Sequence, residues 1–193
     1  MDKIRLLNLF IIILVLVFFC SCTQTVSEEQ KAVEKQIMAF FTRMDEAVSR
    51  QDWSEIYKIV NDYFAEDILI RAEDPNREDQ QVQTINLQQY RFMLQRAPQV
   101  ILDYKHKYRN REIDVAPDGK SATATYSHVE TTTMRKEVAV MFSAYLFKDK
   151  DMATIEPNVT IKNEEQIIMK FEYRGDKLSV TQIDSKVMKM ELL

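Results

Sequence analysis

Two side chains near the middle of the chain are of the types that act as acid and base. His128 and Glu130 stand two residues apart in the segment 121–134, so in an extended strand they share one face with Tyr126. An imidazole and a carboxyl placed this way can act as base and acid. The alternative is a structural role, in which the two side chains satisfy each other or lie at the rim of the sheet. Because pairs of ionisable residues whose pKa values look perturbed often have a structural role, we expect that role here.

Other kinds of chemistry find less support. A zinc site would need His106 and His128 together with Glu130 or another carboxylate, and the spacing of these residues is not typical of such sites. Ser127 is next to His128, but neighbouring strand residues point to opposite faces, which excludes a nucleophile and base pair. We therefore expect no metal, no cofactor and no covalent catalysis.

The composition narrows the classes of partner. The chain has 193 residues and a formal net charge of -4, with no clustered basic segment of the kind that nucleic acid binding requires. It holds only two glycines, Gly119 and Gly175, so loops that cradle phosphates on several glycines are excluded. We expect one domain that binds no nucleic acid.

The first residues have the pattern of an export signal. Lys3 and Arg5 precede an apolar run, Leu6–Phe19, that only Asn8 interrupts. The run has the length of a signal-peptide core. It is shorter than a membrane-spanning helix, which needs about 20 apolar residues. An uncleaved anchor is the alternative, and both readings place the domain outside the cytosol.

The end of this run resembles the lipobox of bacterial lipoprotein precursors. Ser21 is small enough to precede the cleavage point, so Cys22 fits the lipidated position better than Cys20, although Phe19 stands where the lipobox prefers Leu. The resemblance implies removal of residues 1–21 and acylation of Cys22, with palmitate among the expected acyl chains. Residues 22–29 then form an acylated tether. The residue after Cys22 is Thr23, whereas an Asp at this position would resemble an inner-membrane retention signal. The absence of that Asp favours an anchor in the outer membrane, with the domain facing the periplasm.

Periodicity predicts helices first. Ser27, with Gln30 as capping-box partner, opens a helix whose apolar residues recur every three or four positions up to Val48. A second helix, from Trp53 to Phe64, repeats the pattern. A brief strand over 68–70, a loop over 72–81 and a third helix, capped by Asn86 and ending before Pro98, should follow.

The second half of the chain alternates like strands. We expect strands over 100–115, 121–134, 159–173 and 178–190, with turns at 116–119 and 174–176. The segment 135–157 fits a helix or a strand equally well. This order predicts an α+β domain over residues 30–193, with N-terminal helices packed on a strongly curved, mainly antiparallel sheet.

Several short motifs carry a family resemblance. Gln51-Asp52-Trp53, then Phe64-Ala65-Glu66-Asp67-Ile68, and the hairpin from Ile113-Asp114-Val115 to Ser121-Ala122-Thr123-Ala124 resemble the cone-shaped superfamily named for nuclear transport factor 2. Its bacterial members include SnoaL-like and ketosteroid-isomerase-like proteins. Gly175-Asp176-Lys177-Leu178 resembles the family's terminal Gly-Lys-Trp hairpin, with Leu178 in place of Trp. The resemblance implies a conical pocket and allows a homodimer formed through the sheet.

Strand alternation selects the side chains that would face this pocket. A basic ridge should lie on the opposite strand face and consist of Lys105, Lys107, Arg109 and Arg111, as a solvated surface. The polar pocket candidates are Tyr104, His106, Tyr108, Tyr126, His128, Glu130, Asn163 and Glu165.

Three functions remain open at this stage. The first is a non-catalytic binding module, anchored to the membrane through Cys22, for a small apolar ligand or an envelope protein partner. The second is an enzyme of isomerase or hydratase type that uses Tyr126, His128 and Glu130 as its catalytic candidates. The third, by analogy of fold alone, is an assembly component of an envelope secretion machine.

Overall fold

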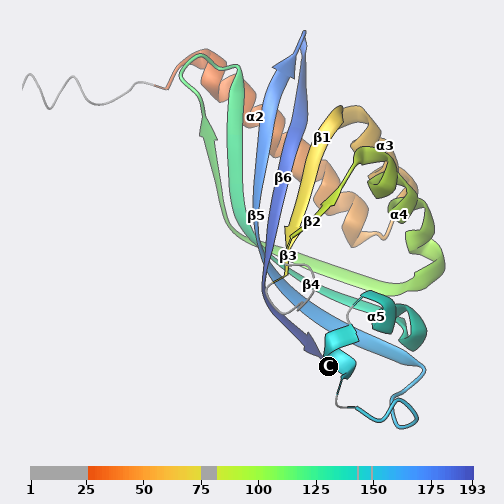
Figure 1. The fold of residues 1–193 in the computed structure, drawn as a ribbon. Helices are drawn as coiled ribbons and strands as arrows, with labels where there is room; N and C mark the ends of the chain where they lie inside the picture. The colour runs from red at the N-terminus through yellow and green to blue at the C-terminus, as the bar shows by residue number, and fades with distance from the viewer. Residues whose placement is uncertain (1–25, 75–81, 143, 149) are drawn as a thin grey trace, which may run out of the picture.

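A computed structural model describes residues 26–74, 82–142, 144–148 and 150–193 of the protein (Figure 1). The expected signal peptide and Cys22 lie outside these described residues, as does most of the expected loop over 72–81. Within the described part, none of the helices is both long enough and apolar enough to cross a membrane.

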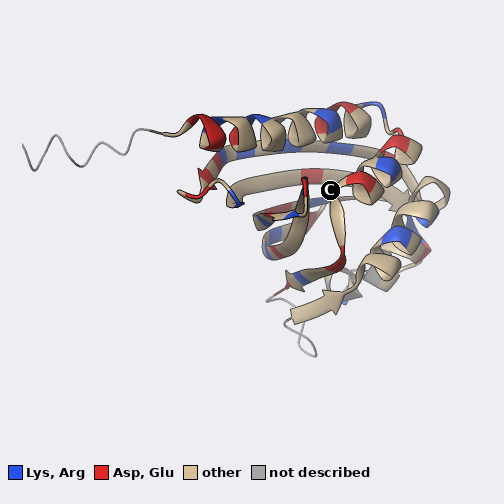
Figure 2. Cartoon of the chain, turned by 90° about the horizontal axis from the view of Figure 1, so that it is seen from above, with Lys and Arg blue, Asp and Glu red and all other residues tan. Residues whose placement is uncertain are grey.

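The first helix, α2 (Glu28–Ser49), begins with the expected capping box. Ser27 Oγ accepts a hydrogen bond from the Gln30 amide at 3.1 Å, and Gln30 Oε1 accepts one from the Ser27 amide at 2.8 Å. The apolar stripe of α2 is buried at Val33, Ile37, Phe40, Phe41, Ala47 and Val48. Acidic and basic residues are interspersed along α2, which lies across one face of the sheet (Figure 2).

The next two helices end differently from the prediction. α3 (Trp53–Tyr63) is capped by Asp52, and Phe64 already belongs to the following strand. α4 (Leu87–Val100) has the expected Asn86 cap but continues through Pro98, so the expected end before Pro98 is wrong. Proline lacks an amide hydrogen and therefore costs one helical hydrogen bond here, in the last turn, while the Ile101 amide still bonds the Ala97 carbonyl.

In the described part of the chain, six strands form one curved sheet in the order β2-β1-β6-β5-β4-β3. Neighbours are antiparallel except for β1 and β6, which are parallel. The predicted α+β class, with helices on a mainly antiparallel sheet, is confirmed. Figure 1 shows β3, β4 and β5 bending in mid-strand so that their lower halves pass beneath α4. The strands are β1 (Phe64–Glu73), β2 (Val82–Ile85), β3 (Ile101–Val115), β4 (Ser121–Arg135), β5 (Asn158–Arg174) and β6 (Lys177–Leu192).

Two stretches of the sheet depart from the prediction. β1 is longer than the expected strand over 68–70 and includes Ala72 and Glu73, which we expected in a loop. These two residues pair with β2 on one side and with β6 on the other. Pairing on both sides thus overrides their weak strand propensity, and β2, with only four residues, gave no separate signal.

Beyond Arg135, the last residue of β4, the described part of the ambiguous segment 135–157 is helical where it is regular. It contains α5 (Lys136–Phe142) and the 3-10 turn η1 (Ala144–Phe147). Ala139 and Phe147 pack with Val159 and Ile161 of β5 in a second, smaller apolar cluster. This cluster explains why the segment is apolar although it lies away from the main core.

A bulge in β3 reverses the direction of one predicted surface residue. Arg109 pairs with Ser127 and Glu112 with Thr125, so β3 holds one extra residue here, and Asn110 has a positive φ of 52°. The bulge turns Arg111 to the face that carries Tyr108. The expectation that Arg111 belongs to the basic ridge is therefore wrong, whereas Lys105, Lys107 and Arg109 are exposed.

Aromatic side chains fill the main core between helices and sheet. The rings of Phe40 and Phe41 meet edge to face at 5.2 Å between centroids, and each also contacts Phe171 of β5. All three side chains are essentially inaccessible to solvent. This packing fixes α2 against β5 and leaves the bent half of the sheet to be covered by α3 and α4.

Candidate ligand-binding cavity

A cavity of about 360 Å³ lies between the helices and the concave face of the sheet. Most of its wall is apolar or aromatic, and the described residues that line it include neither Lys nor Arg. The helical wall consists of Phe40, Phe41, Met44, Val48, Trp53, Ile56, Tyr90, Met93, Leu94 and Ala97. The strand wall consists of Phe64, Ile101, Tyr104, His106, Tyr108, Tyr126, His128, Glu130, Ile167, Met169 and Ile183.

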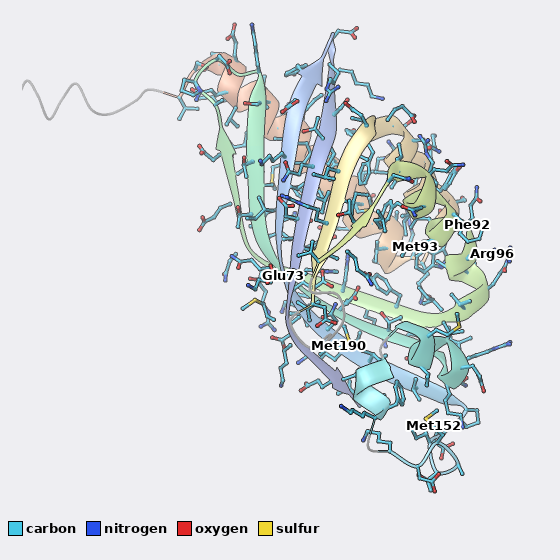
Figure 3. The ribbon with its side chains drawn as sticks, viewed as in Figure 1. Glu73, Phe92, Met93, Arg96, Met152 and Met190 are labelled. Atoms are coloured by element: carbon cyan, nitrogen blue, oxygen red, sulfur yellow. The ribbon has the colours of Figure 1, made fainter. Side chains whose placement is uncertain are left out.

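Helix α4 presents different residues to the cavity and to the outside. Figure 3 shows Met93 on the inner side of α4, turned toward the sheet, whereas Phe92 and Arg96 project from its outer side. The Met93 side chain is also 45% exposed, so it belongs to the opening as well as to the wall. Phe92 lies under the guanidinium of Arg96, 5.4 Å from ring centroid to Cζ.

The polar candidates from the sequence gather in one region. Six of the eight line the cavity: Tyr104, His106, Tyr108, Tyr126, His128 and Glu130. The other two, Asn163 and Glu165, lie on β5 directly opposite Glu130 and His128 of β4. They are not part of the cavity wall but stand behind it.

A hydrogen-bonded carboxylate pair forms the polar end of the cavity. The Asn163 amide donates to Glu130 Oε1 at 3.2 Å and also to Glu165 Oε1. Tyr104 donates its hydroxyl to Glu130 Oε2 at 2.8 Å, and Ser185 donates to Glu165 Oε2 at 3.0 Å. Each carboxylate oxygen therefore accepts one hydrogen bond from a neutral donor.

Burial changes the acidity of this group. Loss of solvent, and then the charge of Glu130, raise the pKa of Glu165 to about 7. Burial also raises the pKa of Tyr90 to about 12, and that of Tyr104 well above its usual value. The phenols thus stay protonated near neutral pH, and Glu165 exchanges its proton there.

The two histidines are neutral parts of an aromatic cluster. Their ring centroids lie 5.6 Å apart, and Tyr108 stacks on His128 with centroids 5.1 Å apart. Burial lowers the pKa of His128, and it lowers that of His106 to about 4. Within the described chain, His128 Nε2 has no hydrogen-bond partner, and no hydrogen bond joins His128 to Glu130.

The fold and the cavity can now be compared with known proteins. A hexachlorocyclohexane dehydrochlorinase, LinA-type3 from Novosphingobium barchaimii, superposes with a TM-score of 0.57 at 8% identity over 86% of this chain and 92% of its own. A putative scytalone dehydratase from Novosphingobium aromaticivorans gives 0.55 at 12% identity over 85% and 90%. An NTF2-like protein of unknown function from Pseudomonas putida gives 0.51 at 12% identity over 81% and 87%. The chain has the nuclear transport factor 2-like cone fold. No family model matches the sequence, and no curated protein matches it significantly.

Arg111, which strand alternation placed on the solvated basic ridge, instead lies against the wall of the cavity. The Arg111 guanidinium lies 4.1 Å from the Phe41 ring centroid and 4.5 Å from that of Tyr108. Its Nη2 is 3.4 Å from Asp45 Oδ2 of α2. Burial raises the pKa of Asp45, and the charge of Arg111 opposes that rise. Strand alternation missed this contact because the sequence does not show the bulge at Asn110.

The cone holds no evident metal centre in its described part. Across residues 26–74 and the described stretches from 82 on, no group of three or more His, Cys, Asp or Glu is arranged to hold a metal ion. The polar end is instead built from carboxylates, an amide and hydroxyls, which suits hydrogen bonding and proton exchange.

Proposed function

We propose that this protein is a lipid-anchored envelope protein whose cone binds a small, mainly apolar molecule. The observation that carries the proposal is the cavity of about 360 Å³, with mainly apolar and aromatic walls and Glu130 as the one carboxylate among its described lining residues. Its volume and its mixture of many apolar and few polar groups are those of small-molecule sites, which commonly measure about 300–1,000 Å³.

The cavity is built on regular elements, which supports a preformed site. Its walls come from α2, α3 and α4 and from strands of one continuous sheet. Phe40 and Phe41 are fixed by contacts with Phe171, so the floor does not depend on a loop. A rigid site loses less entropy when a ligand binds.

A neutral apolar dye tests whether the cavity is open to ligands. N-phenyl-1-naphthylamine should bind and gain fluorescence, and Met93→Trp should weaken its binding at least ten-fold because Met93 lines the wall and the opening. Phe92→Trp is the matched control, since Phe92 lies on the outer side of the same helix. Equal binding by both variants, or none by the unaltered protein, would contradict the proposal.

A second candidate, an enzyme of isomerase or hydratase type, is favoured by one observation. The pKa of Glu165, raised to about 7, gives the polar end a group that gains and loses a proton near neutral pH. Glu130 on the wall, neutral His128 and Tyr126 would be the groups nearest a substrate. The dehydrochlorinase and the putative scytalone dehydratase that share the fold add only the fold to this argument.

The enzyme candidate has its own test. Once a ligand of the cavity is known, incubation with the protein should change it chemically, and the double variant His128→Asn, Glu130→Gln should lose that turnover. Turnover that survives the double variant would remove these residues from the mechanism. A ligand that is bound but never chemically altered would contradict the enzyme candidate and leave binding as the function.

A further inference from the structure

We propose that the ligand is an organic cation, an ammonium or quaternary ammonium group carried on an apolar or aromatic body. The inference rests on the proposed function, since it assigns a ligand class to the same cavity. It follows from the charge at the polar end and from the rings around that end.

The carboxylate pair has no cationic partner in the described chain. Glu130 and Glu165 are bonded by the neutral groups of Asn163, Tyr104 and Ser185, and neither forms an ion pair with Lys or Arg among the described residues. Arg111, which contacts the cavity-lining rings of Phe41 and Tyr108, is paired with Asp45 instead. No positive group of the described chain is therefore placed to balance an ionised carboxylate in this pair.

The rest of the cavity adds no positive charge. Its described lining contains neither Lys nor Arg, and His106 and His128 are neutral at pH 7 because burial lowers the pKa of each. Beside mainly apolar walls, where charges interact more strongly than in bulk water, an unbalanced carboxylate favours a cationic ligand over a neutral or anionic one.

Aromatic rings surround the same end. Tyr104, whose hydroxyl bonds Glu130, lies with its ring 6.0 Å from that of Trp53, and Tyr90 lines the cavity from α4. Ring faces attract ammonium groups, and cages of such rings are a known way to hold quaternary ammonium ions. Because the pKa values of Tyr90 and Tyr104 are raised, these rings remain uncharged and act through their faces.

Glu130 also retains acceptor capacity. A carboxylate offers about four lone-pair positions, and Glu130 accepts two hydrogen bonds, from Tyr104 and from Asn163. A ligand N–H group can therefore bond Glu130 without displacing either donor.

A pair of ligands that differ in charge alone tests the inference. Benzyltrimethylammonium and neopentylbenzene have the same shape, and ligand-observed NMR titration can measure both. The cation should bind at least ten-fold more tightly than the neutral molecule. Glu130→Gln and Glu165→Gln should each reduce that preference several-fold, whereas Glu164→Gln should preserve it, since Glu164 pairs with Lys162 on the opposite strand face.

The outcomes separate the two proposals. If neopentylbenzene binds as tightly as the cation or more tightly, the cation inference is overturned and the binding function stands. If neither molecule binds, both proposals fall. If the cation preference is present but unchanged in both Glu130→Gln and Glu165→Gln, with folding verified by circular dichroism, the carboxylate pair is not its source and the inference is again overturned.

Discussion

Glu130 and Glu165 are joined through a single side-chain amide, because Nδ2 of Asn163 donates to an oxygen of each carboxylate. The arrangement keeps two partly buried acidic groups close together on neighbouring strands. It makes Asn163, which is 4% exposed, the residue on which the geometry of the polar end depends.

Replacing Asn163 by Leu should therefore destabilise the fold. Both partly buried carboxylates lose a donor, which we expect to lower the free energy of unfolding by about 1–3 kcal/mol at pH 8. Urea denaturation measures the effect. Asn158→Leu is the control on the same strand, because Asn158 is exposed, and it should change little. An Asn163→Leu protein as stable as the unaltered one would show that the shared amide has no such role.

The raised pKa of Glu165 predicts a dependence of stability on pH. Folding raises this pKa from about 4.5 to about 7, so the folded state holds the proton more tightly than the unfolded state does. The contribution of Glu165 to stability is then present below pH 4.5, falls as the pH rises to 7 and stays low above it, by about 3 kcal/mol in all.

Glu165→Gln isolates this contribution, since its amide is neutral at every pH. The difference in unfolding free energy between Glu165→Gln and the unaltered protein should shift in favour of the variant between pH 4.5 and pH 7. Denaturation at four or five pH values measures it. A difference that stays constant over this range would contradict the raised pKa.

Arg111 should not be replaceable by Lys. Its planar guanidinium stacks on Phe41 and Tyr108 and pairs with Asp45, contacts that an ammonium group reproduces poorly. We expect Arg111→Lys to cost about 2 kcal/mol of stability, since Asp45 is partly exposed and its pairing is screened. Arg109→Lys, at an exposed position of the same strand, should be neutral. Equal melting temperatures for the two variants would argue against the stack.

The proposed lipid anchor gives a prediction about location. Cys22→Ser should block acylation and processing, so the protein should leave the membrane fraction or accumulate as its precursor. Fractionation and intact-mass measurement check this. A Cys22→Ser protein that is still processed and membrane-bound would be incompatible with acylation at Cys22.

Local sequence signals predicted most of the fold. Ser27 with Gln30, and Asn86, marked the starts of α2 and α4 because capping depends on neighbouring residues alone. The long alternating strands were equally clear. Short β2 and the full length of β1 were not, because those residues form strands through partners distant in the sequence.

The candidate cavity could be predicted only in part, because contacts between residues distant in the sequence also shape it. Alternation on β3 and β4 placed Tyr104, His128 and Glu130 on one face, but it could not show that Glu130 bonds Tyr104 and Asn163 rather than His128. It also missed Arg111, since one inserted residue in β3 reverses every later position until the next irregularity. Tyr90 gave no signal as a wall residue because its helical spacing is also that of an ordinary core position.

Native mass spectrometry of the protein purified from the cells that naturally produce it tests the central claim most directly. The account predicts a small-molecule adduct on the unaltered protein and on Phe92→Trp, and its loss from Met93→Trp, whose larger side chain obstructs the cavity. An adduct retained in full by Met93→Trp, or no adduct on any of the three proteins, would contradict the claim that this cavity binds a ligand.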